Sequence, residues 1–287
     1  MFRRTLAPIA TIALLLCLAP TAAHALFGTP GPGDRILPPP SQYFLPMEAG
    51  ALDSHLDLQL MYTMHSIGVP GLGETSRNVV QMGLDGQIAL LDRFQVGVNV
   101  PFLNHNGVDL SGFSLDSTQF GNMLVKLKVR LLGSSSGPFA LSVFANTLLP
   151  TGSGLATHDF AAVQPGVALS AGFSRISLNA DFSIYESFSS DTNFVSALML
   201  NVHAALKVLF LAPYLGFQFF EPMAGRIPDL ATVGHAPGVS LSAGVQLYPL
   251  SFLHIDVGTR IAFNDNGKRF FASLGQATLV FAAGLRF

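Results

Sequence analysis

Apolar and polar residues alternate along most of the chain, in short stretches that recur many times. In the first stretch, residues 55–65, the apolar side chains of Leu56 and Leu58 flank the charged side chain of Asp57. A period of two places successive side chains on opposite faces of a β-strand. The same alternation recurs in several later stretches, which include 80–90, 94–102, 176–184 and 253–263. The pattern therefore predicts a protein built from strands that each have one apolar face.

The alternation predicts twelve strands in all. Their approximate bounds are 52–65, 78–91, 94–105, 119–132, 138–149, 162–173, 175–187, 194–206, 209–220, 237–248, 251–263 and 269–287. Each strand has about the length needed to cross a bilayer at a tilt. Long and short connections alternate almost throughout, which is typical of outer-membrane barrels with short periplasmic turns. We therefore predict an all-β fold, a transmembrane up-and-down antiparallel β-barrel of about twelve strands.

The composition supports a membrane protein. Only 11% of the residues are charged, whereas soluble domains carry roughly 25%. After the first 25 residues, no uncharged apolar run is long enough for a transmembrane helix. Lipid allows only helices and closed barrels to span it, because every backbone polar group must be paired internally. A secreted, soluble β-protein is the weaker alternative.

The N-terminal sequence predicts export. Arg3 and Arg4 precede an apolar stretch at 6–19, and Ala-His-Ala follows at 23–25, which is the pattern of a secretory signal peptide. An uncleaved anchor helix is the alternative. We therefore expect residues 1–25 to be a signal peptide and the protein to reside in the outer membrane of a Gram-negative bacterium. Residues 26–50, rich in Pro and Gly, are expected to be a periplasmic lead-in or a small plug, and residues 51–287 the barrel.

The polar face of the predicted strands carries charges of both signs. Lys126, Lys128 and Arg130 share one face, and pointing them at lipid would cost roughly 2–4 kcal/mol each at mid-bilayer. They are therefore expected to point inward. The predicted lumen-lining charged residues are Asp57, Asp85, Lys126, Lys128, Arg130, Asp181, Lys207, Asp256 and Arg260. They could form a basic ladder that favours anionic solutes, or a network of ion pairs that fills the lumen.

Four aromatic residues also fall on the predicted inward face: Phe144, Tyr185, Tyr214 and Tyr248. They could narrow the bore, provide a surface for an amphipathic solute, or simply pack. Barrels of eight strands are filled by side chains, and those of 16 to 18 strands hold open channels. Twelve strands fall between these cases, so a narrow or gated passage is plausible.

Catalysis is not expected. Some outer-membrane barrels hydrolyse lipids with a Ser and a His, and His65 and Ser66 are the only candidates that suggest this here. By parity His65 points inward, and no Gly-x-Ser-x-Gly motif supports the pair. The sole cysteine, Cys17, lies in the expected signal peptide, and no His/Asp spacing suggests a metal site. We expect no cofactor, no metal and no nucleic-acid partner.

One region resembles a known family. The segment Gln119–Leu132, the strand Phe139–Leu149 after it and the Pro-Thr-Gly loop at 150–152 are similar to the outer-membrane transporters named for the meta-pathway of phenol degradation. The strand 94–101 resembles the one that precedes this pattern, and Asn122 stands where the family usually has Asp. The resemblance implies a barrel that passes small hydrophobic compounds, including aromatic ones.

Together these observations predict an outer-membrane channel for passive passage of small solutes, with hydrophobic or aromatic compounds as candidates. Its expected partners are outer-membrane lipids, the outer-membrane assembly machinery and a small-molecule solute. The alternative is a filled structural or interaction barrel that acts through its external loops.

The last strand predicts an assembly signal. Phe281, Leu285 and the final residue Phe287 share its lipid-facing side, and such barrels carry aromatic residues at their membrane interfaces. We expect Phe287→Ala to lower the yield of folded barrel, measured as heat-modifiable migration on a gel. Ala282→Ser, on the opposite face of the same strand, serves as the control. Normal yield of the folded Phe287→Ala protein would contradict the prediction.

Overall fold

Antiparallel strands account for nearly all of the described chain. The computed structural model describes residues 47–69, 73–110, 113–134, 136–152, 161–188, 194–226, 237–262 and 277–286. Side chains at the outer ends of several strands, including 64–69, 73–78, 106–119 and 224–226, lie outside this description. The strands are β1 (His55–Val69), β2 (Gly73–Leu90), β3 (Phe94–Leu110), β4 (Phe113–Gln119), β5 (Met123–Gly133), β6 (Phe139–Leu149), β7 (Ala161–Phe173), β8 (Ile176–Phe188), β9 (Phe194–Leu206), β10 (Leu211–Arg226), β11 (Gly238–Leu250), β12 (Leu253–Ala262) and β13 (Ala277–Arg286).

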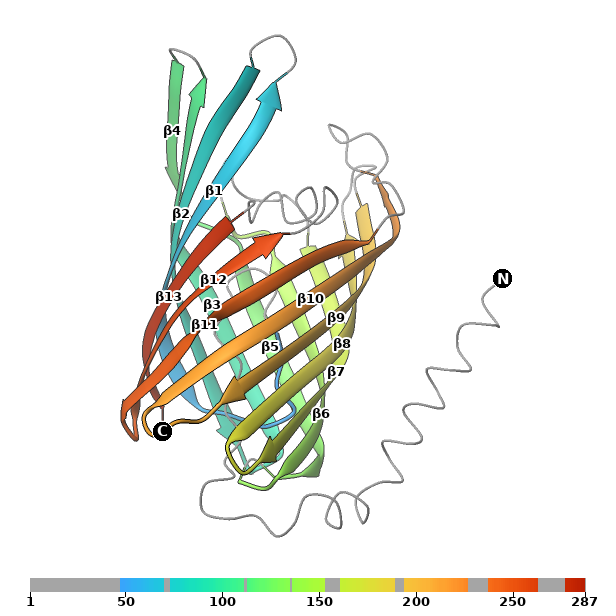
Figure 1. Ribbon diagram of the computed structural model, residues 1–287. Helices are drawn as coiled ribbons and strands as arrows, with labels where there is room; N and C mark the ends of the chain where they lie inside the picture. The colour runs from blue at the N-terminus through green and yellow to red at the C-terminus, as the bar shows by residue number, and fades with distance from the viewer. Residues whose placement is uncertain are drawn as a thin grey trace.

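The strands close into a twelve-strand barrel, as the sequence predicted. From β5 to β13, each strand pairs with the next one in chain order. β13 pairs with β1, β1 pairs with β2, and β2 pairs with β3. The pairing of β3 with β5 closes the ring. β4 pairs only with β3, at residues 104–110, whereas β5 pairs with β3 at residues 94–99. β4 and β5 therefore occupy one position in the barrel wall, interrupted at residues 120–122. Figure 1 shows the tilted strands of this wall.

The outer and inner faces of the wall differ in polarity as the alternation predicted. On β1, Leu56 and Leu58 are 47% and 44% exposed, whereas Asp57 between them is 1% exposed. Leu127 on β5 faces outward between Lys126 and Lys128, which are both buried inside. The exterior is therefore a continuous apolar surface of the kind that lipid requires. No helix among the described residues could cross a membrane.

The two rims of the barrel differ. We call the end that carries the short links β2–β3, β5–β6, β7–β8, β9–β10 and β11–β12 the turn rim, and the other end the loop rim. The link between β2 and β3 is only three residues long, 91–93. In it Leu91 and Asp92 both have positive φ, 51° and 52°, and the Arg93 N–H donates to the Leu90 carbonyl. This is the turn geometry that matches the twist of a β-hairpin.

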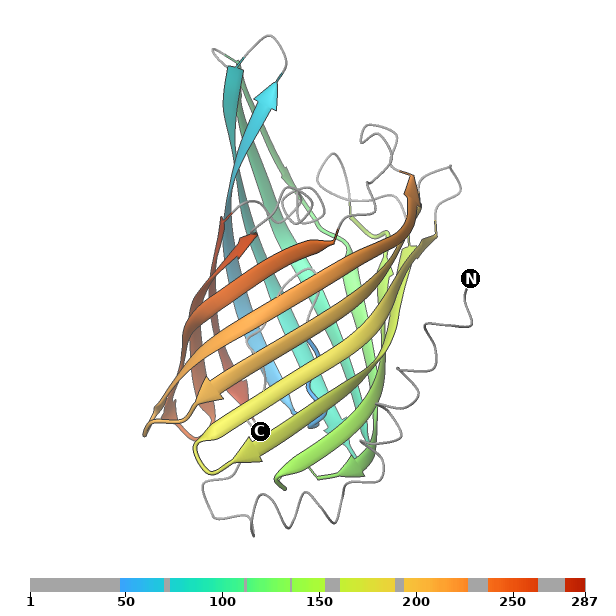
Figure 2. The same ribbon diagram turned by 45° about the vertical axis from the view of Figure 1, so that its right-hand side comes forward.

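At the loop rim, the strand predictions were too short. The residues between the predicted strands, 66–77 and 106–118, are largely strand, because β1 pairs with β2 out to Val69–Gly73 and β3 pairs with β4 out to Leu110–Phe113. β2 and β3 remain paired as far as Ser76 and Asp109. The four strands satisfy one another's backbone groups beyond the barrel, so they extend past their neighbours as a narrow sheet (Figures 1 and 2). The expected strand residues 269–276, and the link 264–268 before them, lie outside the described residues.

Candidate functional site

A segment of the chain before β1 lies inside the barrel. Residues 47–52 are buried there, and we call residues 47–54 the luminal segment. Its backbone bonds to three separate strands. The Glu48 N–H donates to Asp181 on β8, the Ala51 N–H donates to Ser170 on β7, and the Gly50 carbonyl accepts from Ser142 on β6. The barrel wall therefore satisfies the polar groups of a segment that forms no strand of its own.

The luminal segment passes so close to the wall that one position requires glycine. A Cβ added to Gly50 would lie 2.2 Å from the Ala140 carbonyl oxygen and 2.7 Å from the Ser170 nitrogen. Both atoms belong to the backbone and cannot give way as a flexible side chain would. Any larger residue at position 50 must therefore push the luminal segment off the wall.

Two of the predicted basic residues, Lys126 and Lys128, are paired with carboxylates inside the barrel. Lys126 contacts both carboxylate oxygens of Asp85 at 2.9 Å, and Lys128 Nζ lies 2.6 Å from Glu48 Oε2 of the luminal segment. His55 Nε2 lies 3.3 Å from the same Asp85 carboxylate. Buried charges are tolerated only when they are paired and hydrogen-bonded. The arrangement is the ion-pair network, and Lys126 and Lys128 do not form an open basic ladder.

A second set of charges surrounds Asp53, at the end of the luminal segment. His55 Nδ1 lies 2.9 Å from its carboxylate, and Arg286 Nη1 lies 3.5 Å away. Burial alone would raise the pKa of Asp53, but the charge of Arg286 and the hydrogen bond from His55 outweigh it and hold the pKa well below its usual range. Arg286 Nε also donates to His254, whose Nε2 lies 3.2 Å from Asp57. These contacts link β1, β12 and β13 at the turn rim.

Towards the loop rim the inward side chains become apolar. One cluster of buried residues joins eight strands and also packs against Val280 of β13, and we call it the apolar layer. Its members are Met61, Leu124, Leu148, Ala162, Tyr185, Ala197, Met199, Phe220 and Ala262. Most of them lie in the loop-rim half of their strands, and Met61 lies near the middle of β1, whose outer end extends past the neighbouring strands. The described interior is thus charged and closed in its turn-rim half, and nearer the loop rim it holds the apolar layer beside buried polar side chains such as Gln81 and Arg260.

The four predicted aromatic residues divide between these two regions. Tyr185 belongs to the apolar layer. The Phe144 ring covers Gly166, and Tyr214 lies over Gly244 and Gly258 with its hydroxyl 3.1 Å from Asp256. Tyr248 stacks on His254 and lies beneath the Arg286 guanidinium, 5.6 Å from its ring centre. Of the four, only Tyr185 is placed to meet an apolar solute.

The remaining predicted residues fall in several places. Asp181, Asp256 and Arg260 are buried on the inner face. Arg130 is half-buried near the turn rim, and Lys207 lies beyond the end of β9 in the turn that leads to β10. Leu285 and Phe281 face outward, at 47% and 42% exposed. Phe287 and the side chains of His65 and Ser66 lie outside the described residues, as do residues 1–46.

Sequence reasoning did not identify the residues that close the lumen. Glu48 stands outside any alternating stretch, so no periodicity assigned it to the interior. Asp53 falls in the predicted strand 52–65 but was not among the predicted lumen residues, and β1 begins only at His55. Met61 and Phe220 are apolar residues on otherwise polar faces, and these departures from alternation were the available signal for the apolar layer. Among the described residues, no group of three or more His, Cys, Asp or Glu is arranged to hold a metal ion.

Comparison with known proteins shows the fold. No protein-family model and no curated protein matches the sequence. The structure is similar to a COG4313 outer membrane channel from Pseudomonas putida F1, with a TM-score of 0.61 and 12% sequence identity over 87% of this chain and 99% of that one. It is also similar to the NanC porin, with a TM-score of 0.50 and 7% identity over 81% of this chain and 98% of that one. The architecture is therefore that of outer-membrane barrels, while the resemblance to the phenol meta-pathway family stays a prediction.

The close approach at Gly50 gives a test of the luminal segment. We expect Gly50→Ala to displace the segment, because the new Cβ would overlap backbone atoms. Hydrogen exchange followed by mass spectrometry should show faster exchange at the backbone amides of residues 47–54. Gly86→Ala is the matched control, since its Cβ would meet only the Leu56 side chain at an ordinary 3.5 Å. Equal protection of the segment in both variants would show that it does not pack on the wall as described.

Proposed function

We propose that the protein is an outer-membrane channel of a Gram-negative bacterium and that it passes small apolar solutes inward from the cell surface. The observation that carries this proposal is the apolar layer, which faces the interior of the barrel near the loop rim. The interior of a barrel that passes only water and ions is polar, whereas here Met61, Met199 and Phe220 point inward. The similarity to outer-membrane channels and porins supports the location.

The charge distribution argues against a pore for anions. Lys126 and Lys128 are each 6% exposed and each is neutralised by a carboxylate. An anion-selective pore needs basic side chains that remain available to the passing ion. The paired charges instead hold the luminal segment in place, and their hydrogen bonds close the turn-rim half of the lumen.

Passage along the barrel axis requires the luminal segment to move. It contacts β6, β7 and β8 through hydrogen bonds and β5 through the Lys128–Glu48 ion pair. A solute that reaches the apolar layer from the loop rim would meet this segment before the turn rim. We therefore propose a gated route rather than a permanently open pore. The lipid-facing exterior and the terminal strand are proposed to serve contact with outer-membrane lipids and with the assembly machinery.

The closed turn-rim half also favours a second candidate, a structural or interaction barrel that acts through its external loops. Such a barrel would keep its lumen filled and would pass no solute. The protein would then serve no transport, and the apolar layer would only pack. Neither candidate involves catalysis.

Uptake by cells separates the two candidates. We expect expression of the protein to speed the uptake of N-phenyl-1-naphthylamine. This apolar dye becomes more fluorescent in membranes, and lipopolysaccharide slows its entry into cells. Met61→Gln would place an amide in the apolar layer and should lower the protein-dependent rate about fivefold or more, because burying an unpaired amide costs roughly 1–3 kcal/mol. Met82→Gln is the matched control, since Met82 is on the neighbouring strand and faces outward.

Two results would contradict the channel. One is uptake no faster than in cells without the protein, although the folded barrel is present in the outer membrane. The other is equal loss of uptake in Met61→Gln and Met82→Gln, which would show that the apolar layer has no special part in it.

A further inference from the structure

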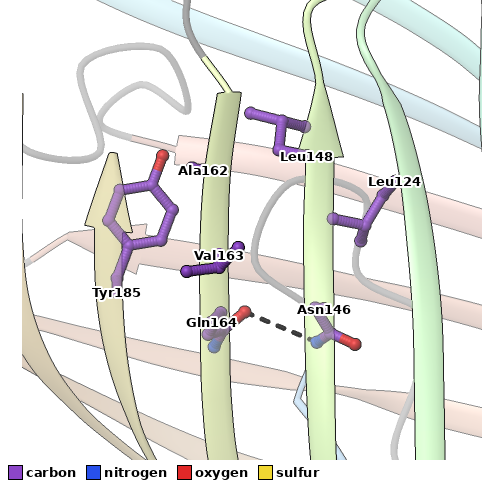
Figure 3. A pocket seen from close by; sticks show the side chains of 7 residues that line it. All are labelled: Leu124, Asn146, Leu148, Ala162, Val163, Gln164 and Tyr185. Atoms are coloured by element: carbon purple, nitrogen blue, oxygen red, sulfur yellow. Dashed lines mark hydrogen bonds between the residues drawn. The ribbon is translucent and has the colours of Figure 1, made fainter. Parts of the chain in front are cut away.

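A small pocket lies where the apolar layer meets the polar half of the lumen. Leu124, Leu148, Ala162 and Tyr185 form its apolar walls, and Asn146 and Gln164 lie beside them (Figure 3). These residues come from four consecutive strands, β5 to β8. The cavity has a volume of about 10 Å³, which is the space that one water molecule needs. A solute can therefore occupy it only if the flanking side chains change rotamer.

The orientation of the Asn146 amide is fixed by its neighbours. Its nitrogen lies 3.3 Å from Glu48 Oε1 and 3.4 Å from Gln164 Oε1, and both partners are acceptors. The nitrogen must point to them, because an amide oxygen there would meet two other oxygens. Figure 3 shows the Asn146 nitrogen turned toward Gln164 and the oxygen turned to the other side.

This orientation leaves one acceptor without a partner. Asn146 is 1% exposed, and its Oδ1 atom has no hydrogen bond among the described residues. Gln164 offers nothing to it, because the Gln164 oxygen accepts from Asn146 and its nitrogen donates to Ser183 and to the Met199 sulfur. Buried polar groups in folded proteins are nearly always paired, so an unpaired one calls for an explanation. A ligand in the pocket could satisfy Asn146 Oδ1 only by offering a hydrogen-bond donor.

We propose that this pocket is a binding subsite for small apolar solutes that carry one hydrogen-bond donor, a hydroxyl or an amine. The donor bonds to Asn146 Oδ1, and the apolar body lies between Leu124, Leu148 and the Tyr185 ring. This inference rests on the proposed function and narrows it from apolar solutes in general to those with a polar donor group. A site with a buried acceptor discriminates against an analogue that lacks the donor, because the acceptor is then left unpaired in the complex.

Three ligands of similar size test the chemistry on the unmodified protein. Cyclohexanol has a hydroxyl donor, cyclohexanone has only an acceptor, and methylcyclohexane has neither. Binding is measured by isothermal titration calorimetry on the full chain in lipid nanodiscs, with empty nanodiscs subtracting partition into lipid. We expect cyclohexanol to bind about threefold to tenfold more tightly than cyclohexanone and methylcyclohexane, the range that one net hydrogen bond gives.

A variant then assigns the preference to this pocket. Asn146→Leu keeps the number and branching of the side-chain heavy atoms and removes the acceptor, so cyclohexanol should lose its advantage over methylcyclohexane. Ser240→Ala is the control, because Ser240 bonds Gln218 on the opposite side of the barrel, and it should keep the full preference. Heat-modifiable migration verifies that each variant is folded. If Asn146→Leu does not fold, the comparison of the three ligands on the unmodified protein still decides.

The outcomes separate the subsite from the channel. Equal binding of the three ligands, or an unchanged preference in folded Asn146→Leu, would overturn the subsite but not the channel. The same conclusion would follow if the protein bound none of the three ligands but still sped dye uptake. Binding of none of them together with no protein-dependent dye uptake would overturn both.

Discussion

Closure of the backbone hydrogen-bond ladder is the constraint from which the other features follow. In hydrocarbon each unpaired backbone group costs several kcal/mol, so a sheet can span it only as a closed ring. β13 supplies that closure by pairing with both β12 and β1. Once the ring is closed, alternation assigns every second side chain to the interior. Polar residues then gather inside and apolar residues outside, which reverses the arrangement of a soluble protein.

This reversal places charges in a confined space, where they must be neutralised. The wall alone pairs Lys126 with Asp85, but Lys128 and Arg286 obtain carboxylates from the luminal segment, through Glu48 and Asp53. The segment is in turn held by hydrogen bonds from the wall. Closure of the turn-rim half therefore depends on the segment and the wall together. Nearer the loop rim, the described interior is occupied by the apolar layer, which carries no charge to neutralise.

Much of the barrel could be predicted from the sequence, because alternation reports directly which face a residue is on. The inward positions of Asp57 and Lys126 followed from parity alone. The extension of β1 to β4 beyond the barrel did not, since the polar and glycine-rich residues there resemble loops and only pairing between strands makes them a sheet. The path of the luminal segment could not be predicted either, although a small plug was one expectation for residues 26–50. Its residues form no periodic element, and they are placed by contacts with strands that lie dozens of positions away, such as Asp53 with Gln95 and Glu48 with Asn146.

The central claim is that the luminal segment lies inside the barrel against β6 and β7. A disulfide between engineered cysteines tests it most directly, because the only native cysteine is Cys17, within the expected signal peptide. Ala51 and Ala140 are buried in contact, so the Ala51→Cys, Ala140→Cys protein should form an intramolecular disulfide in the membrane-inserted barrel. Ala51→Cys combined with Ala262→Cys, near the opposite rim, should not. Absence of the first disulfide in folded protein, or equal formation of both, would contradict the account.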